Sequence, residues 1–140
     1  MHIESYVFFN GRCEEAIEFY QRALGAEVLM LMRNSDSPEP ASPGALPPGS
    51  ENKVLHASLR IGKSRVMASD GHCDGRPEFR GFSLSIAADS VAEAERMFNA
   101  LAEGGTVQMP LAQTFWSPKF GMVADRFGLS WMVSVTTPAT

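Results

Sequence analysis

Apolar and polar positions in the first thirty residues predict a strand, a helix and a second strand. Residues 2–9 are rich in β-branched and aromatic types, which favours a strand, and Asn10-Gly11 ends it. Apolar residues then recur at helical spacing from Glu14 to Leu24, and Gly25 is a typical residue at a helix end. Residues 27–33 are apolar enough for a largely buried strand.

A long proline-rich segment separates these elements from a predicted hairpin. Residues 34–52 hold five prolines, and proline lacks the N–H group that helices and sheets require. We expect a loop there, either a mobile lid over a site or an unstructured insertion. Residues 54–61 and 65–69 predict two strands joined at Gly62-Lys63, a pair of residues suited to a tight turn.

The same order of elements returns in the second half of the chain. Residues 81–87 predict a strand, and Ser90 with Glu93 forms a capping-box pattern at a helix start. Apolar residues at helical spacing continue to Leu101, and Gly104-Gly105 predicts the helix end. Three short strands are expected after it, at residues 106–109, 112–116 and 130–135.

The two halves therefore look like copies of one structural unit. The helical segments at residues 15–20 (EAIEFY) and 93–98 (EAERMF) each lie between strands, which indicates a duplicated βαβββ unit. A small sheet with one helix cannot bury both of its faces, so we expect two units to pair. The predicted fold is α+β, with two βαβββ modules pairing into a curved mixed sheet around a cavity. We expect a single domain over residues 1–140, with modules at about 1–70 and 80–137, a linker at about 71–79, and the proline-rich loop inside the first module.

Three blocks of sequence carry a resemblance that covers nearly the whole chain. They are residues 8–28 (FFNGRCEEAIEFYQRALGAEV), 56–70 (HASLRIGKSRVMASD) and 113–135 (QTFWSPKFGMVADRFGLSWMVSV). These blocks resemble the PhnB-like branch of the vicinal-oxygen-chelate (glyoxalase/bleomycin-resistance/dioxygenase) superfamily, which is also labelled the 3-demethylubiquinone-9 3-methyltransferase domain. The resemblance implies the paired-module fold and association into a homodimer.

Enzymes of this superfamily hold one divalent metal through His, Glu or Gln side chains, one from each of four strands. Transferred to this sequence by the resemblance, the four positions are Ser5, Ser69, Ser83 and Met132. Strand alternation supports the second position, because a turn at Gly62-Lys63 places Ser69 opposite His56 on one face. Hydroxyl and thioether groups are poor ligands for such metals, so we predict no metal site here and no cofactor.

The cavity face predicted from alternation carries the candidate ligand-binding residues. His56 is the candidate catalytic residue, as a general base or as a group that orients a ligand, and a purely structural histidine is the alternative. Trp116 either stacks on a flat ligand or fills the seam between the sheets. The full set is Ser5, His56, Ser58, Met67, Ser69, Ser83, Trp116 and Met132.

A second cluster of metal-binding residue types lies in the predicted linker. Asp70, His72, Cys73 and Asp74 stand within five positions of one another. Their spacing matches no known chelating motif, and residues so close in sequence rarely converge on one ion without help from elsewhere. We therefore expect a solvated turn.

Composition narrows the classes of partner. A formal net charge of −4 offers no basic face for nucleic acid, and no apolar stretch reaches the ~20 residues that span a bilayer. Two cysteines, Cys13 and Cys73, do not make a disulfide framework, so we expect a cytoplasmic protein with free thiols. The chain also has no glycine-rich phosphate loop, and its βαβββ layout differs from the doubly wound sheet of nucleotide-binding and methyl-transferring proteins.

Three functions fit these patterns. The first is a cytoplasmic protein that binds a largely apolar small molecule in the cavity without a catalytic metal. The second is an enzyme of the same superfamily, of the lyase, isomerase or dioxygenase type, using His56 or a non-standard metal site. The third is a non-catalytic dimeric structural or interaction protein whose own side chains fill the cavity. We favour the first, because the fold predicts a cavity while the four metal positions hold poor ligands.

Overall fold

The computed structural model describes residues 1–39, 46–73 and 75–136. The chain divides into two compact units, residues 1–77 and 78–140. Each unit holds one α-helix and one four-stranded mixed sheet, so the α+β expectation of two βαβββ modules is confirmed. The middle of the proline-rich segment, residues 40–45, lies outside the described residues.

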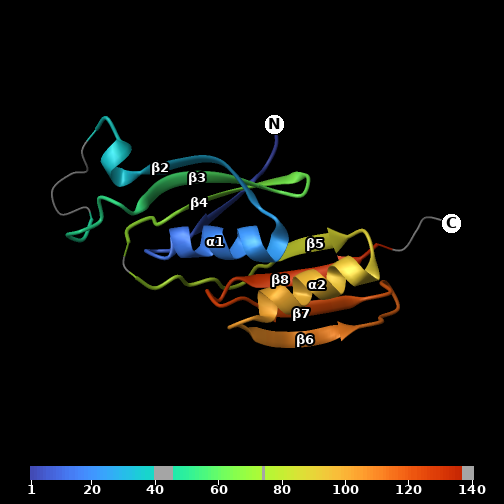
Figure 1. Cartoon of the computed structure of the whole chain (residues 1–140). Helices are drawn as coiled ribbons and strands as arrows, with labels where there is room; N and C mark the ends of the chain where they lie inside the picture. The colour runs from blue at the N-terminus through green and yellow to red at the C-terminus, as the bar shows by residue number, and fades with distance from the viewer. Residues whose placement is uncertain (40–45, 74, 137–140) are drawn as a thin grey trace. The chain divides into compact units, whose positions relative to one another are not determined.

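The first unit has a sheet with the strand order β1-β4-β3-β2 (Figure 1). Strand β1 pairs with β4 in parallel, and the other two pairs are antiparallel. The elements are β1 (Ser5–Phe8), α1 (Cys13–Leu24), β2 (Glu27–Arg33), the short 3-10 helix η1 (Asn34–Asp36), β3 (Val54–Ile61) and β4 (Ser64–Ser69). Gly62 has a φ of 60° and lies with Lys63 between β3 and β4, so the predicted two-residue turn is confirmed.

The second unit repeats this layout with the strand order β5-β8-β7-β6. Strand β5 pairs with β8 in parallel, and β8-β7 and β7-β6 are antiparallel. Its elements are β5 (Leu84–Ala88), α2 (Val91–Ala102), β6 (Thr106–Ala112), β7 (Phe120–Ala124) and β8 (Ser130–Val135). The equivalent strand order in both units supports the duplication indicated by the sequence.

Helix α1 packs against one face of the first sheet and leaves the other face without a helix (Figure 1). Its buried side chains include Ile17, Phe19 and Tyr20. The Tyr20 ring lies 6.0 Å from the ring of Phe9, which directly follows β1. Gly25 ends the helix in the left-handed conformation, with a φ of 68°, and its N–H donates to the Gln21 carbonyl.

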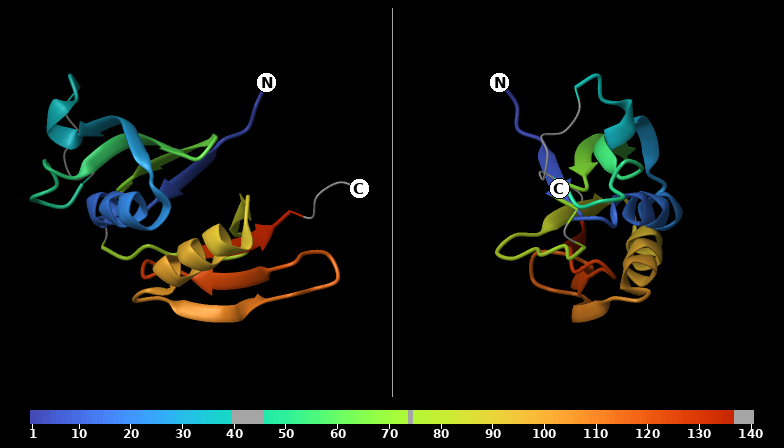
Figure 2. Two further views of the ribbon diagram at one scale, coloured as in Figure 1. Left: turned by 45° about the vertical axis from the view of Figure 1, so that its right-hand side comes forward. Right: turned by 90° about the vertical axis from the view of Figure 1, so that its left-hand side faces the viewer.

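Helix α2 covers one face of the second sheet in the same manner (Figure 2). The hydroxyl of Ser90 accepts a hydrogen bond from the Glu93 N–H, as the capping pattern predicts. The Glu93 carboxylate returns to the N–H of Asp89 rather than to that of Ser90. Gly121 in β7 allows the close approach of α2, because a Cβ there would lie 2.8 Å from the Phe98 ring.

One predicted strand is wrong. Residues 112–116 were expected to form a strand, but β6 ends at Ala112 and β7 begins at Phe120. Between them the N–H of Ser117 donates to the hydroxyl of Thr114, and the N–H of Thr114 donates to the Ser117 carbonyl. These local bonds close a turn, and the following Pro118 has no N–H for a sheet.

A buried carboxylate joins three elements of the first unit. Asp70 is 1% exposed, and its Oδ1 accepts hydrogen bonds from the N–H groups of Gly11 and Cys13, both at 2.8 Å. Its Oδ2 accepts from the N–H of Val54 at 2.7 Å. The side chain thus connects the start of α1 with the start of β3, at the end of β4.

Asp125 plays a comparable part in the second unit. Its Oδ1 accepts hydrogen bonds from the N–H groups of Phe127 and Leu129, and its Oδ2 accepts from the indole N–H of Trp131 at 2.8 Å. This buried carboxylate shapes the turn between β7 and β8 and fixes the Trp131 ring on the α2 side of the sheet.

We predict that Asp70→Asn lowers the free energy of unfolding by about 2–4 kcal/mol, because buried N–H donors lose a charged acceptor. Urea denaturation followed by circular dichroism measures this change. Asp89→Asn is the matched control, since Asp89 is exposed, and we expect a change within about 0.5 kcal/mol. A loss of less than about 1 kcal/mol in Asp70→Asn contradicts the role given to this carboxylate.

Candidate functional site

The helix-free face of the first sheet gathers aromatic, methionine and polar side chains. The strand register sets this face: Tyr6 pairs with Met67, Phe8 with Ser69, and Ser58 with Met67. On β2, Met30 pairs with Ser58 and Met32 with His56. The predicted positions of His56, Ser58, Met67 and Ser69 on one face therefore agree with the observed register.

A hydrogen bond between two side chains from distant parts of the chain lies on this face. The phenol oxygen of Tyr6 and Nδ1 of His56 are 2.9 Å apart, and the two ring centroids are 5.5 Å apart. The Tyr6 ring also lies 5.0 Å from the Phe8 ring. Tyr6 is 39% exposed and Phe8 is 51% exposed, so a considerable aromatic surface remains open.

The two serines on this face are covered. Ser58 is 2% exposed, and its hydroxyl accepts a hydrogen bond of 2.8 Å from Nε of Arg65. Ser69 is similarly buried and accepts a hydrogen bond from the N–H of Gly71. Both serine hydroxyls thus accept hydrogen bonds from neighbouring groups of the protein. The solvent-accessible surface of this face comes from Tyr6, Phe8 and the half-buried His56 and Met67.

Ser5 is a correction to the predicted site. The resemblance placed it on the cavity face, but its partner in β4 is Val66, and Val66 pairs with the buried Leu59. Ser5 therefore shares the helix-covered face with Val7. Tyr6 occupies the helix-free face in its place.

The remaining predicted residues belong to the second unit. Met132 is one end of a row of three methionines, since it pairs with Met122 on β7, which pairs in turn with Met109 on β6. The Ser83 hydroxyl donates a hydrogen bond of 2.8 Å to that of Ser130, the first residue of β8. Because Ser130 and Met132 alternate with the buried Trp131, this row lies on the helix-free face of the second sheet.

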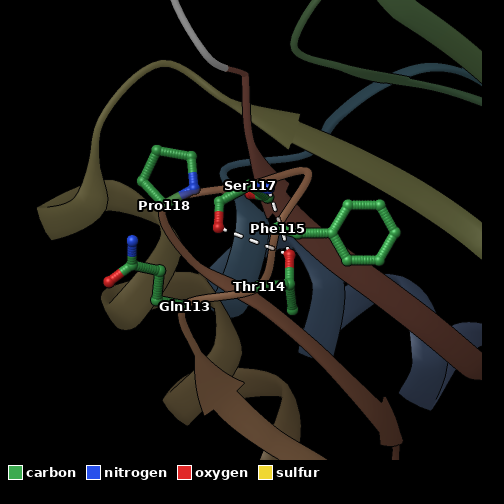
Figure 3. A pocket seen from close by; sticks show the side chains of 5 residues that line it. All are labelled: Gln113, Thr114, Phe115, Ser117 and Pro118. Carbon is green, nitrogen blue, oxygen red and sulfur yellow. Dashed lines mark hydrogen bonds between the residues drawn. The ribbon is translucent and has the colours of Figure 1, made fainter.

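Trp116 lies in the turn between β6 and β7, beside a pocket of about 380 Å³. The pocket is lined by Gln113, Thr114, Phe115, Ser117 and Pro118. The Phe115 ring is 97% exposed and points away from the Gln113 and Pro118 side chains (Figure 3). The Trp116 ring makes edge contacts with Phe115 at 4.7 Å and with Phe120 at 5.3 Å.

The residues at the four inferred metal positions do not fit a divalent ion. Ser5 faces α1, the Ser69 hydroxyl is engaged with the backbone, and Ser83 is bonded to Ser130. The fourth position, Met132, offers a thioether, which hard and borderline metals bind poorly. Within residues 1–39, 46–73 and 75–136, no three His, Cys, Asp or Glu side chains are placed to hold an ion.

The loop after β4 forms a turn. The N–H of Cys73 donates to the Asp70 carbonyl, and Cys73 has a positive φ of 59°. The Asp70 carboxylate accepts hydrogen bonds from three backbone N–H groups, those of Gly11, Cys13 and Val54. Asp74 lies outside the described residues.

The arrangement of helices and strands defines the structural class of the protein. Two βαβββ modules, each with a four-stranded mixed sheet and one helix, match the vicinal-oxygen-chelate or glyoxalase-like architecture. A fosfomycin resistance protein, FosX, from Listeria monocytogenes has this fold with a TM-score of 0.62 at 13% identity, over 99% of this chain and 93% of its own.

The chain belongs to the family described as 3-demethylubiquinone-9 3-methyltransferase, whose model matches residues 1–134. It is 37% identical to protein YjdN of Escherichia coli, over 96% of this chain and 95% of YjdN. The crystal structure of PA1353 from Pseudomonas aeruginosa matches with a TM-score of 0.83 and 46% identity, covering 97% and 98% of the two chains. A PhnB protein from Bacillus cereus matches with a TM-score of 0.79 and 28% identity, over 97% of this chain and all of its own. The resemblance to PhnB-like proteins is thereby confirmed.

No helix among the described residues is both long and apolar enough to cross a membrane.

Sequence reasoning missed Tyr6, Phe8 and Arg65 as members of the site. The buried Val7 and Phe9 alternate with Tyr6 and Phe8, and this pattern was the available signal for the outward face of β1. The bond from Arg65 to Ser58 depends on side-chain direction, which the pattern of apolar and polar residues does not give.

We predict that neither cysteine is a reactive thiolate. Burial and the nearby Asp70 charge raise the pKa of both Cys13 and Cys73. A raised pKa means less thiolate at a given pH, so in native protein at pH 8 a disulfide dye should leave Cys13 unmodified and label Cys73 more slowly than free cysteine. The labelling rate of Cys73 should keep rising at pH values above the ordinary thiol range.

The Cys73→Ser variant isolates the Cys13 signal, and labelling in urea shows that both thiols are chemically intact. Labelling of Cys73 faster than free cysteine at pH 7 contradicts this prediction.

Proposed function

We propose that the protein binds a small, largely apolar molecule on the helix-free face of its first unit, without a catalytic metal. The observation that carries this proposal is the Tyr6–His56 hydrogen bond within an exposed aromatic surface. A polar pair that fixes orientation, set among apolar side chains, is the usual composition of a small-molecule site.

The apolar part of this face supports the proposal. Tyr6 and Phe8 have ring centroids 5.0 Å apart with an interplanar angle of 35°, so together they offer a platform for a flat molecule. Met67 lies on β4 and is paired with Tyr6 of the neighbouring strand β1. Its flexible thioether adapts to the shape of a ligand. Covering such side chains contributes about 25 cal/mol per Å² of apolar surface removed from water.

Binding is better supported than methyl transfer, although the family description names a methyltransferase. Nucleotide-type methyl donors are typically held at the strand ends of a doubly wound parallel sheet. Each unit here has a four-stranded mixed sheet with a helix on one face, and the open aromatic surface lies on a sheet face. The fold therefore favours a ligand that lies across strands.

We expect the neutral fluorescent dye N-phenyl-1-naphthylamine to bind with a saturable rise in emission. It should also raise the melting temperature, because a ligand of the native state stabilises it. Phe8→Ser removes half of the aromatic platform and should weaken binding about tenfold or more, as expected for loss of a large apolar contact. Fluorescence titration measures both dissociation constants.

Val91→Ser is the matched control, because Val91 is 38% exposed on α2 and belongs to the second unit. This variant should bind the dye as the unmodified chain does. Equal weakening in Phe8→Ser and Val91→Ser, or no saturable binding at all, rejects the proposed face.

A further inference from the structure

The Tyr6–His56 bond determines which hydrogen-bonding group His56 presents outward. A phenol O–H is a stronger donor than a neutral imidazole N–H, and an imidazole nitrogen is a stronger acceptor than a phenol oxygen. The proton between them is therefore assigned to Tyr6, and Nδ1 of His56 accepts. Neutral His56 then carries its own proton on Nε2, so it offers a donor.

Nε2 of His56 is available to a ligand. Among the residues that the structure describes, Nδ1 has the Tyr6 partner and Nε2 has no hydrogen-bond partner. His56 is half-buried, so part of its ring remains accessible to a ligand.

Positive charge lies on the same sheet face as this donor. Arg65 donates through Nε to Ser58, which is two residues from His56 on the same strand face. Glu4 lies 3.5 Å from the same Nε and offsets part of the charge, but neither terminal nitrogen of Arg65 has a hydrogen-bond partner within the described chain. Arg60 differs, because one of its terminal nitrogens is bonded to the Glu27 carboxylate.

We infer that the ligand of this face is an aromatic acid, whose carboxylate or sulfonate accepts from Nε2 of His56 while its ring lies over Tyr6 and Phe8. This inference rests on the proposed function and adds the chemical class of the ligand. The Arg65 guanidinium favours the anion over an uncharged acceptor.

Two dyes with one ring system test the inference. N-phenyl-1-naphthylamine is uncharged, and 8-anilino-1-naphthalenesulfonate adds a sulfonate to the same rings. We expect the sulfonate to bind at least about tenfold more tightly, and its advantage to shrink with added salt. His56→Leu should weaken the sulfonate about tenfold and change the neutral dye less than threefold, roughly, because it removes one donor and keeps apolar bulk.

Three further variants test separately the N–H donor of His56, the tautomer that Tyr6 imposes on it, and the charge of Arg65. His56→Gln keeps an N–H donor and should retain most of the sulfonate affinity. Tyr6→Phe keeps the ring but releases Nδ1, so it should weaken the sulfonate selectively. Arg65→Gln should remove most of the salt dependence of sulfonate binding. Arg60→Gln is the matched control and should leave the affinities for both dyes unchanged, because Arg60 is already paired with Glu27.

Each result has a defined meaning. If the neutral dye binds and the sulfonate is no tighter, or if His56→Leu weakens both dyes alike, the aromatic-acid inference is wrong and the proposed function stands. If neither dye binds, the proposed function itself fails. If neither dye binds and Phe8→Ser converts a dimer into a monomer in sedimentation, a second copy of the chain covers this face, and both proposals are overturned.

Discussion

The buried Asp70 carboxylate is the constraint on which the first unit depends. An ionised carboxylate in a dry environment is costly unless its oxygens are satisfied, and here three backbone N–H groups satisfy them. Those donors belong to the loop before α1, to α1 itself and to β3. The charge therefore fixes the start of the helix against the sheet, and with it the choice of which sheet face the helix covers.

That choice creates the candidate site. Once α1 takes the face of Val7, Ala57 and Leu59, alternation assigns Tyr6, Phe8 and His56 to the opposite face. The second unit reaches the same arrangement by a different local route, with Asp125 organising a β-turn and the Trp131 indole. Strand parity thus places the helix-packed core and the candidate site on opposite faces of the sheet, so side chains of the candidate site can change without disturbing that core.

Strand parity also explains how much the sequence predicted. Gly62-Lys63 is a local turn signal, and counting outward from it placed His56, Ser58 and Met67 on one face as observed. Ser5 was misplaced because its position was transferred by the resemblance and not counted from a turn, and a shift of one residue along a strand reverses the face of the side chain. The false strand at 112–116 arose from apolar residues in a turn closed by Thr114 and Ser117, where local hydrogen bonds outcompete sheet pairing.

The Tyr6–His56 bond lay beyond sequence reasoning, because it joins residues fifty positions apart through the parallel pairing of β1 with β4. The side chains around this bond can be compared with what a metal site requires. A metal site needs several anionic or strongly basic ligands converging on one point. Here the serines of the first face hydrogen-bond to Arg65 and to the backbone, and one imidazole nitrogen is occupied by a phenol. The polar groups left without a partner on this face, among the described residues, are Nε2 of His56 and the terminal nitrogens of Arg65, and they lie on the same face as the exposed rings of Tyr6 and Phe8. These groups are donors, whereas a metal ion needs several converging acceptors.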